Sequence, residues 1–538
     1  MASTTEAHSL SFDCIVVGSG SAGSCAALSA SDSGCKRVLI IDKCPPEWVG
    51  GNGYFTAGAH RTVHQGLQDL LPIVTNVTPE LASNIDLEPY TKDDFTKDVI
   101  RLQVENGVHP KSDMHLVEAL VDNSRDAIQW LADRVKMPFT FAFNRQAYLI
   151  EGRQVFWGGM ALSVADGGKG VIHAHQKALA EAGIQVWFNT EAIQLLMENG
   201  AISGVLARRN GNDIRLSAPA VILACGGFEA SPDLRSKWLG DEWAHAKVRG
   251  SPYNTGDGIS LATSVGAALA GDFKHCHSTC WDADAPNDAG NRTLSNQYTK
   301  SGYPLGLMLN VKGKRFVDEG EDFRNFTYAK FGREILKQPS SVAFQIYDQQ
   351  TVKWLRVEEY GDDVVKKVWA DTLEELVEKL LPDEEASVED RKEFLKTIKS
   401  YNEAVLAFRS ENPTKVWDPA IKDGLSTKSF SHSIIPPKSN WALPIIESPF
   451  LAVKVTCGIT FTFGGLSVEP ETAAILCTVG EPIKGLFCTG ELVGGLFYLN
   501  YPGGSGLTAG CVFGRKAGRE AAKLSTARAL SIHLSDSA

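Results

Sequence analysis

Three glycines near the N-terminus have the spacing of a pyrophosphate-binding turn. Gly18, Gly20 and Gly23 directly follow the apolar run 15–17. In such a loop the first glycine allows a tight turn, the second lets the backbone approach a phosphate, and the third lets a helix pack against the preceding strand. The spacing therefore indicates a phosphate-binding turn that joins a strand to a helix.

The elements that must position this turn follow in the expected order. A helix is predicted over about 22–33, and its N-terminal N–H groups and positive dipole end would face the phosphates. The next apolar run, 38–41, ends at Asp42, whose carboxylate can accept hydrogen bonds from a ribose. Strand, glycine loop, helix, second strand and terminal acid together predict a site for an ADP-containing dinucleotide.

A second strand–glycine unit lies further along the chain. The apolar run 221–228 contains the pair Gly226-Gly227, and a predicted hairpin through 195–197 and 202–207 precedes it. Two such units separated by a small β insertion indicate a two-part flavin-type nucleotide domain.

Glycine-rich strands return near the C-terminus, so the nucleotide domain is predicted to be discontinuous. We expect an α/β fold in which a discontinuous Rossmann-like FAD-binding domain carries an inserted α+β capping domain for the substrate. The expected boundaries are 10–274 for the first part of the FAD-binding domain, 275–445 for the capping domain, 446–525 for the second part and 526–538 for a tail. Helical stretches are predicted within 65–150 (including 114–134), over 373–408 and from 505 to about 523.

The composition is that of an ordinary globular protein. The 538 residues are 43% hydrophobic and 22% charged, with a net charge of −11. A strongly basic face is needed for nucleic-acid binding, so we expect no nucleic-acid partner. There is no apolar run of 18 residues, and the first ten residues resemble no targeting peptide, so we expect a cytoplasmic protein without an integral membrane segment.

The eleven cysteines include no CxxC pair, which favours reduced thiols and excludes c-type haem and iron–sulfur ligand spacing. His275, Cys276, His277 and Cys280 lie close together, but their spacing matches no standard zinc site. We therefore expect no metal.

The motifs together resemble one family. GSGSAG at 18–23, GGN at 50–52, TGE at 489–491 and the runs ACGGF, TGDGI, GKRFVDE and GGSGL are similar to the flavoprotein subunits of fumarate reductase and succinate dehydrogenase and their soluble relatives, over about 10–525. The runs KVRGSPYNTGDGI and GELVGGLFYLNYPGGSGL look most like tricarballylate dehydrogenase, which desaturates a tricarboxylate to cis-aconitate.

This resemblance implies FAD as the cofactor. Asn52 stands where succinate dehydrogenase has the histidine that holds its flavin covalently, so non-covalent binding is expected. The residues that the resemblance places at the FAD are Gly18, Ser19, Gly20, Ala22, Gly23, Asp42, Lys43, Asn52, Ala57, Gly58, Ala192, Asp257, Phe461, Glu491, Ser505, Gly506 and Leu507.

The resemblance also implies a chemistry. In the family a hydride passes from one carbon to flavin N5 while a base takes a proton from the neighbouring carbon. The proton-handling residue of relatives is an arginine after an RFxxE run, and Arg324 is its nearest match, with Glu319 and Arg315 as relay candidates. A free guanidinium has a pKa above about 12, so it needs neighbouring charges or desolvation to act as a base. The alternative is a surface cation, or a structural partner of Asp322 or Glu321.

The substrate residues depart from those of fumarate reductases. Thr460 and Phe461 occupy the positions of two family histidines, and Tyr501 replaces an arginine, which disfavours succinate and fumarate. Tyr501 can still donate a hydrogen bond to a carboxylate or carbonyl oxygen, and we place it among the catalytic residues. The expected substrate-binding residues are His277, Arg249, Thr460 and Lys300.

Three functions remain open at this point. The first is desaturation of a tricarballylate-like acid. The second is an enoate or fumarate-type reductase or a 3-ketosteroid-type dehydrogenase. The pocket for its less polar substrate would be lined by Phe461, Phe463, Phe497, Tyr498 and Tyr501. The third is a non-catalytic flavin electron carrier. No haem or iron–sulfur segment is recognisable, so an enzyme of this kind needs a separate acceptor: a quinone, an iron–sulfur protein or oxygen.

Overall fold

The computed structural model describes residues 10–103, 112–382 and 387–536. The chain divides into two compact units. The first comprises Met1–Leu239, Gly250–Cys276 and Phe461–Ala538, and the second comprises Gly240–Arg249 and His277–Thr460. The capping domain predicted over 275–445 remains a proposal, and the second compact unit has somewhat different limits.

A six-stranded sheet forms the centre of the first unit. Its order is β20-β21-β13-β2-β3-β9, and neighbouring strands are parallel except for the antiparallel pair β20–β21. All residues of β2 and β3 are buried, as expected for β-branched runs in a sheet covered on both faces. The predicted Rossmann-like domain, built from both ends of the chain, is confirmed. Its strands are β2 (Cys14–Val17), β3 (Val38–Ile41), β9 (Gln185–Trp187), β13 (Val221–Leu223), β20 (Ala474–Leu476) and β21 (Pro482–Cys488).

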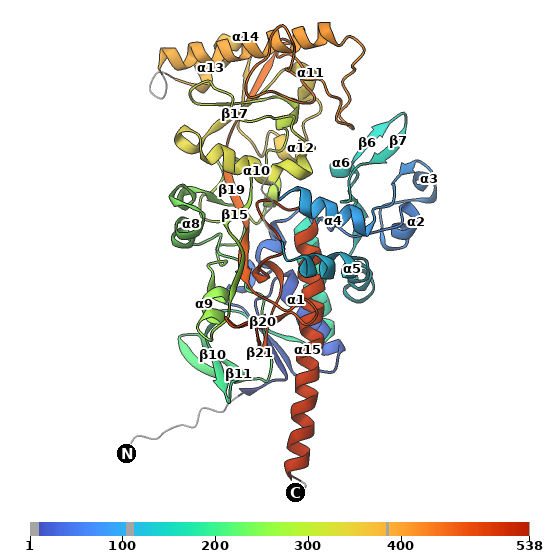
Figure 1. The fold of residues 1–538 in the computed structure, drawn as a ribbon, viewed down its shortest axis with the longest axis vertical. Helices are drawn as coiled ribbons and strands as arrows, with labels where there is room; N and C mark the ends of the chain where they lie inside the picture. The colour runs from blue at the N-terminus through green and yellow to red at the C-terminus, as the bar shows by residue number, and fades with distance from the viewer. Residues whose placement is uncertain (1–9, 104–111, 383–386, 537–538) are drawn as a thin grey trace. The chain divides into compact units, whose positions relative to one another are not determined.

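Two helices from opposite ends of the sequence pack side by side in this unit (Figure 1). They are α1 (Ser21–Asp32) and α15 (Ser505–Asp536). An added Cβ at Gly514 of α15 would lie 2.8 Å from the Ala22 carbonyl oxygen of α1. Glycine costs up to about 1 kcal/mol in a helix interior, and here close backbone approach accounts for it. The glycines on this face are Gly510, Gly514 and Gly518.

The predicted β insertion is present. β10 (Thr190–Glu198) and β11 (Ala201–Arg209) form an antiparallel hairpin, which β12 (Asn212–Ser217) and β1 (Leu10–Ser11) extend to four strands. The remaining helices of the parallel-sheet region are α7 (Gly167–Glu181), α8 (Pro232–Leu239) and α9 (Asp257–Thr263).

The region predicted as helical over 65–150 is in fact mixed. The helix expected over 114–134 is α5 (Met114–Trp130), followed by a π-helical turn, Leu131–Val135. Short strands lie around it, and they were missed because short apolar runs do not distinguish a strand from a helix. The other elements are α2 (Leu67–Leu70), α3 (Pro79–Ala82), β4 (Ile85–Asp86), α4 (Lys92–Arg101), β5 (Phe139–Phe141), α6 (Phe143–Gln146), β6 (Ala147–Ile150), β7 (Arg153–Phe156) and β8 (Leu162–Val164).

The second unit is built on a mixed sheet whose order is β14-β19-β17-β16, with β15 and β18 also paired to β19. β15 and β19 are long strands whose residues are divided between the two units. The elements are β14 (Lys247–Val248), β15 (Leu269–Asp282), β16 (Leu307–Asn310), α10 (Arg324–Leu336), β17 (Ala343–Tyr347), α11 (Gln349–Val352), α12 (Val357–Tyr360), β18 (Lys367–Ala370), α13 (Leu373–Leu380), α14 (Val388–Glu411) and β19 (Phe450–Leu466).

Two helix predictions need correction. The helix expected over 373–408 is two helices, α13 and α14, because Pro382 disfavours helix at the residue before it and Ser387 begins α14 with a capping box. α15 continues to Asp536 instead of ending near 523, since no glycine or proline follows to stop it. Among the residues that the structure describes, no helix has the length and apolar character needed to cross a bilayer.

Candidate active site

The glycine loop of the first unit has the geometry of a phosphate cradle. Gly18 has a φ of +113°, and an added Cβ would overlap the Ala224 carbonyl oxygen. At Gly20 an added Cβ would stay 3.6 Å from the nearest atom, Gly50 O, so this side of the loop is open. Gly20 caps α1 without a side-chain hydrogen bond to its first N–H groups. An anion can therefore approach the helix N-terminus directly.

Asp42, at the end of β3, fixes this loop. Its Oδ2 accepts hydrogen bonds from the Ser19 N–H and Oγ–H, each at 2.7 Å, and its Oδ1 accepts the Cys44 N–H at 2.9 Å. The next residue, Lys43, forms an ion pair with Asp257 at the start of α9. Four residues predicted at the cofactor thus meet at the carboxyl ends of the strands, where open α/β sheets bind ligands.

Asn52 belongs to a buried polar network. It lies in the 3₁₀ turn Gly51–Phe55, its Oδ1 accepts the Ser251 N–H at 2.9 Å, and its Nδ2 donates to Glu229 Oε1. Asn254 Nδ2 donates to the same oxygen at 2.5 Å. The sequence analysis did not identify Glu229. Its signal was a carboxylate placed directly after the glycine pair and phenylalanine that end the second strand–glycine unit.

Glu491 lies beside this network. Its Oε1 accepts hydrogen bonds from Thr462, at 2.6 Å from the backbone N–H and 2.8 Å from Oγ1. Burial, and then the charge of Glu229, raise the pKa of Glu491 well above its usual range, and burial raises the pKa of Glu229. An added Cβ at Gly227 would overlap both Thr462 Oγ1 and Glu491 Oε1, so the double glycine makes room for the carboxyl.

The other predicted cofactor residues lie in the same unit. Gly58 has a φ of +70°, and an added Cβ would lie 2.9 Å from the Gly167 backbone, so the loop containing Ala57 needs glycine there. Ala192 stands at a register shift in β10, where the ladder is interrupted. The first residues of α15 are Ser505, Gly506 and Leu507.

Four aromatic side chains cluster at the start of α15. The rings of Phe461 and Tyr501 are stacked, with centroids 5.6 Å apart and planes at 9°, and the two other rings of the cluster lie within 6.4 Å of them. An added Cβ at Gly506 would lie 3.5 Å from Phe461 and 3.8 Å from Tyr501. The cluster consists of Phe461, Phe463, Phe497 and Tyr501. Around this helix terminus the first unit is therefore apolar and aromatic.

In the second unit, three predicted substrate residues come together. Arg249 follows β14, and its N–H donates to Ile459 O of β19 at 2.9 Å, which brings it beside Thr460. Arg249 Nη1 lies 3.4 Å from Thr460 Oγ1. Burial and the charge of Arg249 hold the pKa of His277, on β15, well below its usual range, so the ring is neutral. The side chain of Arg249 is 8% exposed, and the cluster offers a buried cation, a hydroxyl and an imidazole.

The fourth predicted substrate residue, Lys300, has structural contacts. Its side chain is fully buried, and Nζ donates to Gln297 O at 2.8 Å and lies 3.7 Å from Asp282 Oδ2. Burial lowers the pKa of Lys300 to about 8, against the opposing charges of Asp282 and Glu359. Its substrate role stays a prediction, and these contacts are those of an internal lysine.

Arg315 and Glu319 form a buried ion pair. Arg315 Nε donates to Glu319 Oε1 at 3.1 Å, and Nη1 donates to Pro436 O at 2.5 Å. The same Glu319 oxygen accepts the Met308 N–H at 2.9 Å. The pair ties β16 and the loop around Pro436 to the GKRFVDE run. These contacts fit a positioning role better than the predicted proton relay.

Arg324 is the first residue of α10, whose N-terminus has no side-chain cap. Burial raises the pKa of Tyr303 well above its usual range, and the nearby Arg324 charge opposes this shift. Of the two acids considered as structural partners of Arg324, Glu321 also pairs with Lys330, and Asp322 lies 3.6 Å from Lys422.

Comparison with known proteins places this chain in a family. The FAD_binding_2 family, described as "FAD binding domain", matches residues 88–507. The chain belongs to this family. It is 28% identical over 539 residues to vinyl phenol reductase of Lactiplantibacillus plantarum, covering 97% of this chain and 99% of that protein. It is 27% identical over 519 residues to fumarate reductase (cytochrome) of Shewanella frigidimarina, covering 95% and 77%.

A solved flavocytochrome c3 fumarate reductase in its open conformation has the same fold. It superposes with a TM-score of 0.68 at 24% identity, covering 96% of this chain and 79% of that one. As a member of the FAD_binding_2 family with fumarate reductase-type relatives, the chain is an FAD-dependent oxidoreductase of the class that acts on CH–CH groups. Both the superfamily and the cofactor predicted from the sequence are confirmed.

The residues present fit FAD. The open glycine loop and the uncapped start of α1 suit a pyrophosphate. Asp42 lies at the end of the second strand, where the acid that binds the ribose hydroxyls is expected. The first turn of α15 presents backbone N–H groups next to aromatic rings, as a flavin ring would require.

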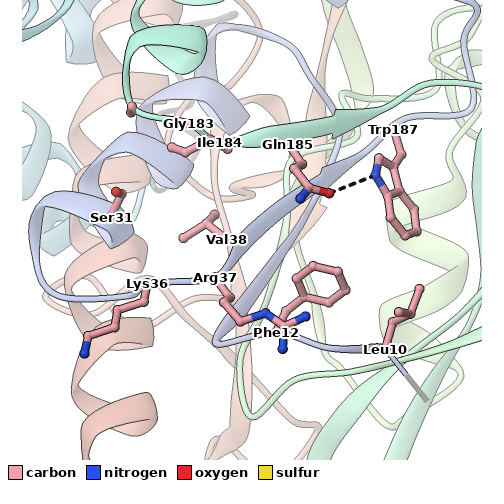
Figure 2. Close-up of a pocket in the computed structure, with 11 residues that line it drawn as sticks. Leu10, Phe12, Ser31, Lys36, Arg37, Val38, Gly183, Ile184, Gln185 and Trp187 are labelled. Atoms are coloured by element: carbon pink, nitrogen blue, oxygen red, sulfur yellow. Dashed lines mark hydrogen bonds between the residues drawn. The ribbon is translucent and has the colours of Figure 1, made fainter. Parts of the chain in front are cut away.

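A cavity of about 230 Å³ lies elsewhere in the first unit (Figure 2). Its lining includes Phe12, Arg37, Val38 and Gln185, at or before the amino ends of β2, β3 and β9, together with Trp187, the last residue of β9. This edge of the sheet is opposite to the one that carries the glycine loop, so the cavity is separate from the FAD site. Among the described residues, no group of histidine, cysteine and acidic side chains has the arrangement of a metal site.

Proposed function

We propose that this oxidoreductase reduces or desaturates a carbon–carbon bond conjugated to a carboxylate or ketone, on a substrate that carries a ring. The anionic or carbonyl oxygen is bound by Arg249, with Thr460 and neutral His277 beside it. The aromatic rings of Phe461 and Tyr501 contact the ring of the substrate. Tyr501 also supplies a neutral O–H donor for an oxygen of the substrate.

The proton and the hydride use different parts of the chain. When bound, FAD supplies the acceptor or donor of the hydride. Arg324 gives a proton to the carbon next to the hydride carbon in the reducing direction and takes it back in the oxidising direction. The N-terminus of α10 disfavours a cation, and this favours proton release from the guanidinium. Arg315 and Glu319 hold the segment before α10 in place.

The observation that carries the proposal is the aromatic cluster at the start of α15. Two of its members stand where fumarate reductases are expected to have a polar residue that grips a dicarboxylate: Phe461 at a histidine position and Tyr501 at an arginine position. Rings packed at 5.3–6.4 Å offer a planar substrate stacking and edge contacts instead of charge. One relative is named for vinyl phenol, a ring-bearing substrate, which supports the same choice.

A tricarballylate-like acid is the second candidate. It is favoured by two arginines of the second unit, Arg249 and Arg324, since arginine can bind carboxylates through two parallel hydrogen bonds. Three carboxylates would call for a further cation, and the ammonium of Lys300 is already engaged with Gln297 and Asp282. The ring-bearing substrate therefore ranks first.

The remaining parts of the proposal concern FAD attachment, electron transfer and location. Asn52 in place of a histidine supports non-covalent FAD, so acid precipitation should release the flavin. A separate electron acceptor is proposed, either a quinone, an iron–sulfur protein or oxygen, and the cytoplasm is the proposed location.

The experiment is anaerobic mixing of the enzyme with a panel of substrates while the flavin absorbance is followed. The oxidised enzyme is mixed with the saturated compounds, and the reduced enzyme is mixed with the unsaturated ones. The panel contains ring-bearing enoates, cyclic enones, tricarballylate with cis-aconitate, and succinate with fumarate. A ring-bearing pair should react fastest, and Arg324→Ala should slow that reaction by about 10²- to 10⁴-fold, because a positioned acid or base contributes that much.

The control is Lys337→Ala, which removes a half-exposed cation at the C-cap of the same helix. It should react like the unaltered enzyme, and both variants should keep FAD. Fastest reaction with tricarballylate would favour the second candidate. An unchanged rate in Arg324→Ala would overturn the assignment of Arg324.

A further inference from the structure

Glu229 is a buried carboxyl with only one of its two oxygens satisfied. Its side chain is fully buried, and Oε1 accepts hydrogen bonds from Asn52 and Asn254. Among the described residues, Oε2 has no hydrogen-bond partner. A buried carboxylate oxygen without a donor is costly, so this oxygen needs either a ligand or a proton.

Another carboxyl can supply that partner. Glu491 and Glu229 are within hydrogen-bonding reach of each other. Glu491 Oε1 is already engaged with the Thr462 N–H and Oγ1. Each carboxyl therefore has one oxygen bound to neutral donors. A direct side-chain interaction between two carboxyls is favourable only when a hydrogen lies between them.

Charge leads to the same conclusion. Two carboxylates about 4 Å apart repel each other by about 4 kcal/mol at an effective dielectric constant of 20. Arg235 Nη1 donates to the Glu229 backbone carbonyl at 2.5 Å. Within the described part of the chain, the amides of Asn52 and Asn254 and the hydroxyl of Thr462 donate to the carboxyl groups of the pair, and all three donors are neutral.

We propose that Glu229 and Glu491 share one proton, so that the pair carries a single negative charge beside the FAD. The O–H donates from one carboxyl to the other, which gives the Glu229 Oε2 its partner and removes one of two adjacent charges. Carboxyls in close contact behave in this way elsewhere, because like charges at such distances do not both ionise. The proximity of Glu491 to FAD is itself part of the cofactor proposal, whereas the shared proton follows from the described contacts alone.

The shared proton makes stability depend on pH in a predictable direction. Burial raises the pKa of both groups, so the folded protein holds a proton that the unfolded chain releases near the ordinary glutamate range. The unfolded state then binds fewer protons, and stability falls as pH rises above about 4.5. This loss continues until the pair itself loses its proton in the folded state.

The first test is infrared spectroscopy of the purified holoenzyme near pH 7. A shared proton gives the carbonyl stretching band of a protonated carboxylic acid, and this band shifts in D₂O. The band should be lost in Glu229→Gln and in Glu491→Gln, because each leaves one carboxylate that accepts hydrogen bonds from an amide. The matched control, Glu198→Gln on an exposed position of β10, should keep it.

Absence of the band from the unaltered enzyme would overturn the proposal without any variant. Retention in either glutamine variant would show that one carboxyl keeps its own proton, and this also overturns sharing. Neither result depends on the substrate, so the proposed function is tested separately.

The second test compares the pH dependence of unfolding. Above about pH 5, and until the pair loses its proton in the folded state, the unfolding equilibrium constant of the unaltered protein should rise relative to that of Glu229→Gln by about tenfold per pH unit, since one proton separates them. Parallel curves would contradict the proposal. Glu491→Gln gives the same comparison if Glu229→Gln does not fold.

Discussion

The FAD site of the first unit and the proposed substrate cluster of the second unit are built from different parts of the chain. The FAD site depends on backbone: glycine turns with positive φ, an uncapped helix start and strand ends that carry short acids. The substrate cluster depends on ordinary side chains, such as Arg249 and His277, that three strands bring together. Backbone requirements restrict the sequence strongly, whereas a surface of mixed side chains restricts it weakly.

This difference explains why one site determines the cofactor of the chain and the other leaves the substrate open. A left-handed φ next to a carbonyl oxygen admits glycine alone. In contrast, β19 and α15 form with Phe461 and Tyr501 at the positions where the resemblance implies a histidine and an arginine, and under the proposed function this difference changes the substrate. This comparison between the two sites can be tested by three substitutions, which change a backbone conformation, a buried charge and a single hydroxyl.

The largest effect is expected from Gly18→Ala. A Cβ at this position would overlap the Ala224 carbonyl and would also hold alanine at a φ of +113°. We expect loss of FAD from the purified protein, measured as the flavin-to-protein absorbance ratio. Gly34→Ala is the matched control, since Gly34 has a φ of +118° but no atom within 4 Å of an added Cβ. Equal FAD content in the two variants would contradict the steric argument.

The sequence predicted the first unit well because its signals are local. The run from Gly18 to Asp42 specifies a turn, a helix and two strands within a few residues, and the structure places them as expected. The parallel strands are also apolar on both faces, which makes them easy to recognise.

The sequence predicted the rest less well because the deciding contacts are not local. Glu229 becomes notable only when the fold brings it against Glu491, 262 positions later, and the interior position of Lys300 depends on Asp282 and Gln297. The mixed elements between Leu67 and Val164 are too short for their periodicity to be read.

A smaller effect, on stability, is expected from Arg315→Ala. This change leaves the Glu319 carboxylate buried without its cation, and breaking a buried ion pair costs about 3–5 kcal/mol. Urea unfolding should show this loss in the free energy of unfolding. Arg208→Ala breaks an exposed pair with Asp213 on β11 and β12, and should leave the midpoint nearly unchanged. A fall in turnover with unchanged stability would instead make Arg315 part of the proton relay.

The smallest effect is expected from Tyr501→Phe, which removes the hydroxyl and keeps the aromatic ring. The ring should stay stacked on Phe461, so FAD content and the flavin spectrum should not change. A neutral hydrogen bond contributes about 0.5–1.5 kcal/mol, so kcat/KM with the best ring-bearing substrate should fall by about 2- to 10-fold. Tyr148→Phe is the control: Tyr148 stacks on Trp157 in the first unit, and this change should have no effect. A loss far above tenfold would show that Tyr501 takes part in proton transfer and does more than bind an oxygen of the substrate.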